Sequence, residues 1–226
     1  MAKKQDQGAR TTLEEVNESL SSAAQRVEEN KKYIYWALIA IAAVLLIVFG
    51  YLNFIRKPNV EKAIQQIGKA DIELFQNDDE NALKDYEKVA AEFSNKPGER
   101  AHLNAAILLY EKGEYEKAAK HLESFTPVGD LIGPASQSLL GDCYVNLKKY
   151  DQAMTAFDKA ISMSGDNELY TPAFMVKKAT LLHAQKKYAE EAAIYQTIKD
   201  KYPMYAQQTG FQVDKYLERA NGLAGK

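Results

Sequence analysis

The sequence contains very little cysteine and histidine. Its one cysteine, Cys143, cannot form an internal disulfide, so it excludes a disulfide-stapled fold and fits an oxidising or a reducing compartment equally well. The three histidines, His102, His121 and His183, lack the i, i+4 spacing typical of metal ligands on a helix. We therefore expect no metal site, and we expect Cys143 to pack as a small apolar side chain.

Catalytic motifs are also missing from the sequence. It has no glycine-rich phosphate loop, no nucleophile elbow and no paired carboxylates in an apolar setting. The acidic pairs Asp78-Asp79 and Glu190-Glu191 are expected in turns or on solvated faces. We accordingly expect no catalytic residues and no cofactor, and the chain is not predicted to be an enzyme.

Neither sign of charge dominates, and strand patterns are absent. The chain has 29 basic and 31 acidic residues, interleaved without long blocks, which argues against nucleic acid as a partner. After residue 58, valine and isoleucine do not alternate with polar residues as a strand requires, and proline is sparse. The soluble part is therefore predicted to be all helical.

One long stretch, residues 33–54, has no charge. As a helix its 22 residues reach about 33 Å, enough to cross a hydrocarbon core of roughly 30 Å. Aromatic residues and then basic residues flank it on both sides, as at membrane interfaces: Tyr33, Tyr35, Trp36, Tyr51 and Phe54, and Lys31, Lys32, Arg56 and Lys57. This pattern predicts a transmembrane helix at residues 33–55 that holds the chain in a lipid bilayer by a single span.

Two other interpretations of the apolar stretch are less consistent with its sequence. A buried helix of a soluble core is seldom apolar on every face over this length. A cleaved signal peptide would begin nearer the N-terminus, and the Ala40-x-Ala42 motif is followed by a further dozen apolar positions. A permanent anchor is the interpretation we favour.

The flanking charges do not orient this helix. Three basic residues precede it and four follow it within 20 residues: Arg26, Lys31 and Lys32, then Arg56, Lys57, Lys62 and Lys69. Because the positive-inside rule depends on an imbalance, it assigns neither side.

Residues 1–32 form a tail with an amphipathic pattern. Apolar residues recur every three or four positions, at Leu13, Val16, Leu20, Ala23 and Val27, and Thr12 with Glu15 is a plausible capping box. The tail is either a solvated helix leading into the membrane or a helix held by a partner or by the membrane surface. Its six basic and six acidic residues do not favour anionic lipid.

Residues 138–160 match the tetratricopeptide repeat pattern closely. Gly141 allows two helices to approach, Tyr144 fills their interface, and Tyr150, Ala153, Phe157 and Ala160 supply alternating large and small contacts in the second helix. The spacing of these residues favours tetratricopeptide repeats over armadillo or HEAT repeats.

The same pattern recurs along residues 56–226. Tyr115, Tyr150 and Tyr188 lie 35 and 38 residues apart, near the repeat period of about 34. A weaker first copy contains Ala70, Leu74, Ala82, Tyr86 and Val89. We predict an all-α fold in which about four helix-turn-helix units stack into a solenoid. A last helix from Tyr205 to about Leu223 would cap the end, with Val213 and Leu217 facing inward.

The first helix of each unit should line a concave groove that binds an extended or helical peptide. The candidate groove residues are Arg100, Leu103, Ile107, Tyr110, Glu111, Ser138, Asp142, Asn146, Thr180 and His183. Each could instead be an ordinary solvated or packing position, because a few residues supply most of the binding energy of an interface. Leu103 and Ile107 stand where repeats that grip a carboxylate have Lys and Asn, so such a clamp is not expected.

The order of tail, span and repeats resembles the YfgM-like ancillary subunits of the bacterial SecYEG translocon. The resemblance is carried by Glu28-Glu29-Asn30-Lys31-Lys32, by the span, and by Glu61-Lys62-Ala63 after it. It implies a location in the bacterial inner membrane, with a cytoplasmic N-terminus and a periplasmic repeat domain. It also implies partners: the translocon, a periplasmic chaperone of the membrane-anchored peptidyl-prolyl isomerase type, and nascent secreted proteins.

These expectations combine into a membrane-anchored adaptor for protein-protein interactions, an accessory of the translocon and its periplasmic chaperones. The alternative is a structural scaffold in another envelope complex, such as one for outer-membrane protein export or cell division, without contact to the translocon.

Overall fold

The computed structural model describes residues 28–225, and within this range all regular structure is helical. The predicted tail helix lies outside the described residues apart from its last positions. The chain divides into two compact units, residues 1–59 and 60–226. The all-α class and the helical repeats expected from the sequence are confirmed.

The described part of the first unit is one apolar helical segment. Residues 28–50 are α-helical and η1 (Tyr51–Arg56) is a π-helical turn. By length and composition this segment can cross a membrane, and none of its most apolar window is buried against protein. Just after η1 stands Pro58, which has no N–H for an i→i−4 bond, so a wide turn is a natural local solution here.

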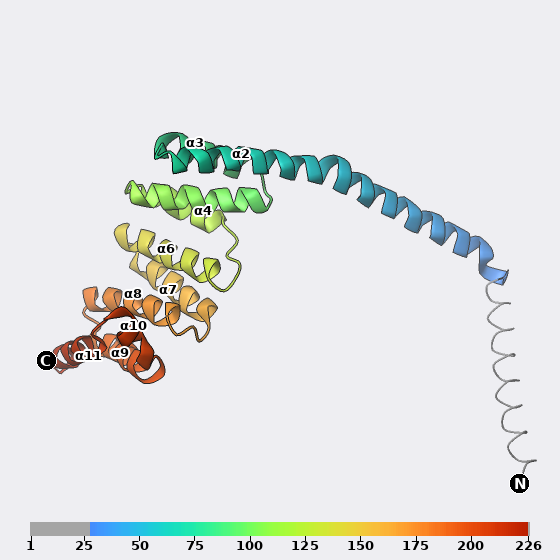
Figure 1. The fold of residues 1–226 in the computed structure, drawn as a ribbon. Coiled ribbons are helices and arrows are strands. Elements are labelled where there is room, and N and C mark those ends of the chain that lie inside the picture. The colour runs from blue at the N-terminus through green and yellow to red at the C-terminus, as the bar shows by residue number, and fades with distance from the viewer. Residues whose placement is uncertain (1–27, 226) are drawn as a thin grey trace, which may run out of the picture. The chain divides into compact units, whose positions relative to one another are not determined.

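Four helix-turn-helix pairs and a two-helix cap follow (Figure 1). The pairs are α2 (Lys57–Phe75) with α3 (Asp79–Glu92), α4 (Lys96–Glu111) with α5 (Tyr115–Ser124), α6 (Ile132–Asn146) with α7 (Tyr150–Ser164), and α8 (Tyr170–Ala184) with α9 (Tyr188–Lys201). The first helix, α2, begins three residues before Val60, and everything after Val60 belongs to the second unit. The cap consists of α10 (Pro203–Thr209) and α11 (Val213–Ala224). Four units were expected, and four are present in the described chain.

All four pairs turn in the same way. The turns contain one residue of left-handed backbone conformation each: Asn77, Gly113, Lys148 and Lys186, with φ of 60°, 78°, 58° and 60°. In each turn the next residue donates its N–H to a carbonyl five positions earlier, as Glu114 does to Leu109 at 2.8 Å. This is the Schellman bond, which satisfies the last carbonyls of the first helix. The repeat is thus one backbone motif used four times.

The close approach predicted at Gly141 is present. A Cβ atom at this position would lie 2.5 Å from Cε1 of Phe157, so only glycine fits against the ring. Phe157 is 1% exposed and Tyr144 is also buried. Gly141 therefore lets α6 and α7 pack at a distance that a larger residue would prevent.

The cap differs from its prediction as one continuous helix. Gly210 has left-handed backbone (φ 72°) and ends α10 by donating its N–H to the carbonyl of Ala206 at 2.9 Å. α11 then folds back onto α9, and Val213 and Leu217 are buried as expected. The prediction was wrong because the apolar period continues across Gly210, whereas the backbone reverses there.

Glu191 also corrects the sequence interpretation, which placed it in a turn or on a solvated face. Its side chain is fully buried in the first turn of α9. Nδ1 of His183 lies 2.7 Å from one carboxylate oxygen, and Nη2 of Arg219 lies 2.7 Å from the other. The burial arises because α11 covers this turn and brings Arg219 to it, a contact between segments 28 residues apart.

Candidate protein-binding groove

The first helices of the pairs, α2, α4, α6 and α8, line two hollows, and we call their shared surface the first-helix face. One hollow of about 370 Å³ lies among α2, α3 and α4, with Asp71, Leu74, Phe75, Tyr86, Asn104, Ile107 and Leu108 in its wall. The other, of about 280 Å³, lies among α6, α7 and α8, with Asp142, Val145, Tyr150, Phe157, Val176, Lys177, Thr180, Leu181 and Ala184. Both walls are mainly apolar with a few polar groups, which suits a polypeptide ligand.

All ten predicted groove residues lie on α4, α6 or α8. Ile107 lines the first hollow, and Asp142 and Thr180 line the second. Tyr110 lies beside Asp142 and Asn146, so it connects α4 to α6 between the hollows. Tyr110, Asp142 and Asn146 from neighbouring pairs therefore come together, and so do Asp142 and Thr180, whereas Ile107 lies in the other hollow. The binding role of all these residues stays a prediction.

Ser138 and Leu103 are less accessible than the groove prediction requires. Ser138 is 2% exposed, and its hydroxyl has no hydrogen-bond partner in the described chain. α6 is buried around most of its circumference, so the periodic projection that gave Ser138 an outward position does not apply there. Leu103 packs partly against the core. Arg100, Ile107, Glu111, Asn146 and Thr180 are exposed.

The carboxylate of Asp71 in the wall of the first hollow is satisfied by neighbouring side chains. Asp71 accepts a hydrogen bond from the hydroxyl of Tyr86 at 2.7 Å and forms an ion pair with Arg100. Burial is the largest cause that raises the pKa of Tyr86, to about 12, and the hydrogen bond to Asp71 is the next largest. Arg100 is thus engaged with the protein itself, and what remains for a partner in this hollow is chiefly apolar surface.

The second hollow repeats this arrangement. Asp142 pairs with Lys177 across α6 and α8. Burial raises the pKa of the Asp142 carboxyl, although the ion pair opposes that shift. Burial and the neighbouring Asp142 raise the pKa of the Cys143 thiol to about 12. Cys143 is therefore a neutral packing residue, as expected, rather than a nucleophile.

His183, the last predicted groove residue, has a structural contact. Its ring is half-buried and bonds Glu191, as described above. The side chain therefore joins α8 to α9 at the end of the stack. A partner that contacts His183 would therefore meet a ring that already bonds Glu191.

Sequence reasoning missed a contact between two histidines. Nδ1 of His102 on α4 lies 3.0 Å from Nδ1 of His121 on α5. Burial lowers the pKa of both rings, and for His121 the neighbouring His102 adds to this effect. Glu87 stands 4.0 Å from the far nitrogen of His121. The 19 residues between the histidines hide the pair from any test of helical spacing, and no group of three metal-ligating residues occurs within residues 28–225.

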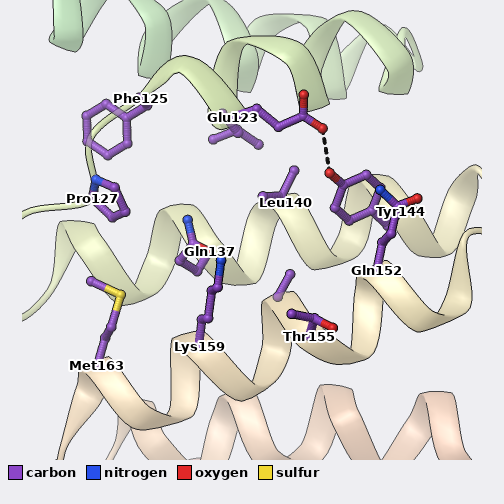
Figure 2. A pocket seen from close by; sticks show the side chains of 12 residues that line it. Glu123, Phe125, Pro127, Gln137, Leu140, Tyr144, Gln152, Thr155, Lys159 and Met163 are labelled. Carbon is purple, nitrogen blue, oxygen red and sulfur yellow. Dashed lines mark hydrogen bonds between the residues drawn. The ribbon is translucent and has the colours of Figure 1, made fainter.

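A third hollow lies on the side of the second helices and was also not predicted. Figure 2 shows it between α5, α6 and α7. Its volume is about 430 Å³. Leu122, Phe125, Leu140 and Met163 supply apolar surface, and the hydroxyl of Tyr144 donates to Glu123 at 2.5 Å. In the sequence, the feature that points to this hollow is the length of the link between α5 and α6, which is longer than the links before α4 and α8.

Comparison with known proteins agrees with this architecture. Residues 67–127 and 135–167 each match a family model described as tetratricopeptide repeat. A search of curated proteins found no match.

Among solved structures, MamA is similar with a TM-score of 0.60 and 14% identity over 73% of this chain and 84% of that one. YrrB, described as a protein of the same repeat type with an unusual peptide-binding site, has a TM-score of 0.52 and 17% identity over 74% and 89%. The pilF protein of Pseudomonas aeruginosa has a TM-score of 0.52 and 20% identity over 81% and 87%. At these identities the similarity concerns the fold alone.

Proposed function

We propose that this chain is a membrane-anchored adaptor whose first-helix face binds a segment of a partner protein, because residues 67–127 and 135–167 match the tetratricopeptide repeat, a class that serves protein-protein interaction. The observation that carries the proposal is the pairing of two mainly apolar hollows on that face with one exposed apolar helix outside the repeats.

The anchor is supported by the exposure of the apolar helix. Exposed apolar side chains occur around its whole circumference, among them Leu38, Ile39, Ile41, Val44 and Ile47. In water such a helix would expose apolar area well beyond the patches normal for a soluble monomer. Lipid removes this cost, and a helix satisfies all its backbone polar groups internally, as the hydrocarbon core requires.

The chemistry of the first-helix face favours an apolar peptide segment. Arg100 and Lys177 are already paired with Asp71 and Asp142, so neither is a free cation for an acidic partner. The exposed positions in the hollows, such as Ile107 and Phe75, offer apolar contact. The similarity to YrrB fits this function, because that protein is described as having a peptide-binding site.

The finer proposal rests on the resemblance to YfgM-like proteins. On that basis the anchor lies in the bacterial inner membrane with the N-terminus in the cytoplasm, and the repeats lie in the periplasm. There they would serve the Sec translocon and its periplasmic chaperones, receiving nascent secreted proteins.

Site-specific photo-crosslinking in native membranes tests both parts. A crosslinker at Val44 should capture a translocon subunit, and one at Ile107 should capture a soluble chaperone or a nascent chain. A crosslinker at the exposed Lys120 on α5 is the matched control and should capture neither. Capture at Val44 of subunits of a different envelope complex would support the scaffold role instead. No specific product at Ile107 would reject the groove.

A substitution tests the groove separately. Ile107→Asp should abolish co-purification of the partner, because the apolar segment of the partner would cover the carboxylate and desolvate it. Met204→Asp, at a similarly exposed apolar position on α10, should leave co-purification intact. A reporter fused after Lys226 that is active only in the cytoplasm would refute the periplasmic assignment.

A further inference from the structure

A row of exposed apolar side chains follows two links from a second helix to the next first helix, α5–α6 and α7–α8. We call it the loop edge, and it consists of Val128, Leu131 and Ile132 before and at the start of α6, with Met163 at the end of α7 and Leu169 and Tyr170 at the start of α8. Val128 is 60% exposed and Leu131 49%. We propose that the loop edge rests on the lipid bilayer at the depth of the headgroups. The proposal depends on the membrane anchor proposed above.

The second compact unit of the chain has two ends, and the loop edge lies at the end where α2 begins. α2, α4, α6 and α8 all start at this end, and the links α3–α4, α5–α6 and α7–α8 lie there together (Figure 1). The turns inside the pairs, including Phe75 at the end of α2, lie at the opposite end. Val60, the first residue of the second unit, is therefore at the same end as the loop edge.

The chain connection keeps this end near the bilayer. Val60 follows Phe54, the last residue of the apolar stretch, by six positions. Six residues span about 9 Å as a helix and at most about 20 Å when extended. The start of α2 must lie within this reach of the membrane surface whatever the angle at the junction. The contact requires the stack of units to lie along the bilayer plane.

The loop that carries the central residues is held in place rather than loose. The backbone N–H of Thr126 donates to Glu99 on α4 at 2.7 Å, which fixes its beginning. At its end, a Cβ at Gly133 would come within 3.3 Å of the backbone of Val128 and 2.8 Å of Met163, so the loop packs directly on α6. A fixed loop that turns Val128 and Leu131 outward keeps apolar surface available for a partner.

The charges along the loop edge set the depth and the lipid type. Asp130 stands between Val128 and Leu131, and Asp166 and Glu168 precede Leu169. Carboxylates do not enter the hydrocarbon core without large cost, so the contact is at headgroup level. Anionic lipid would repel them, and the surface therefore suits a zwitterionic headgroup.

The experiment uses the full chain in vesicles of zwitterionic lipid whose acyl chains are brominated close to the headgroup, because bromine quenches nearby tryptophan. The natural chain has one tryptophan, Trp36, which lies in the proposed span. Its quenching reports the anchor. In a Trp36→Phe background, Leu131→Trp reports the loop edge. Phe75→Trp, 88% exposed at the opposite end of the unit, is the matched control. Circular dichroism verifies that each variant keeps its helix content.

We expect loss of emission for Trp36 and for L131W, and none for F75W. Replacing part of the zwitterionic lipid by anionic lipid should reduce the quenching of L131W. If Trp36 is quenched but L131W is not, the lipid contact is refuted while the anchor stands, and the loop edge is left for a protein. Equal quenching of L131W and F75W would also refute the lipid contact of the loop edge. Unquenched Trp36 would reject the anchor itself.

Discussion

The Gly141→Ala variant tests the packing of the repeats most directly. In an ordinary helix interior this change is favourable by up to about 1 kcal/mol, because alanine has the higher helix propensity. Here the added Cβ would lie 2.5 Å, 2.6 Å and 3.0 Å from three ring atoms of Phe157. The ring is buried and cannot swing into solvent, so α6 and α7 must move apart. Overpacking of this kind costs about 1–3 kcal/mol.

We therefore expect Gly141→Ala to destabilise the repeats by about 1–2 kcal/mol net, or to lower their melting temperature by roughly 2–8 °C for a domain of this size. Gly68→Ala is the matched control, since it lies inside α2 with no atom within 4 Å of its added Cβ. It should be neutral or stabilising. Urea and thermal unfolding of the full chain in detergent, followed by circular dichroism, give both values.

A double variant completes the test. Phe157→Leu alone should destabilise by leaving a cavity, yet it should also make room for the Cβ of Gly141→Ala. The two changes should then cost less together than the sum of their separate costs, with a coupling of about 1 kcal/mol. If Gly141→Ala stabilises the protein as Gly68→Ala does, the close approach of α6 and α7 is refuted.

Three further predictions concern other contacts. Lys148→Gly should stabilise the third unit by about 1 kcal/mol, because its left-handed backbone strains any side chain; an unchanged urea midpoint would contradict this. Burial lowers the folded pKa values of His102 and His121, so the unfolded chain binds more protons below about pH 6.5 and stability should fall as the pH drops through that range. His121→Gln should flatten that slope in unfolding titrations, and an unaltered slope would exclude the pair as its source. Arg219→Ala should cost about 3 kcal/mol by leaving the buried Glu191 with one partner, and Glu191→Gln in the same background should recover part of the loss. Hydrogen exchange should locate the Arg219→Ala effect in α9 and α11, and an effect spread over all units would speak against it.

The local features of the repeats could be predicted because neighbouring residues determine them. Gly141, Tyr144 and Phe157 lie within 17 positions of one another, and their spacing defines which helix faces meet. The number of units followed from the same spacing. The apolar stretch from 33 to 54 was equally readable, because composition alone decides it.

Contacts made across the fold could not be predicted in this way. Glu191 looks like a solvated residue until α11 covers it, and the break at Gly210 that allows this is a single backbone angle. The contact of His102 with His121 depends on how α4 meets α5. Periodicity assigned Ser138 to an open face because it cannot register that α6 is surrounded. Each case depends on distant packing that a local pattern does not encode.

The buried thiol of Cys143 has a practical consequence. As the chain's sole cysteine, held neutral and out of solvent between helices, it reacts with an alkylating reagent only when the third unit opens. The rate at which Cys143 is labelled therefore measures how often the third helix-turn-helix pair opens locally. Because its neighbour Asp142 lines the second hollow, a peptide bound there should lower the labelling rate of Cys143. Binding to the first-helix face could then be followed in the natural chain without any substitution.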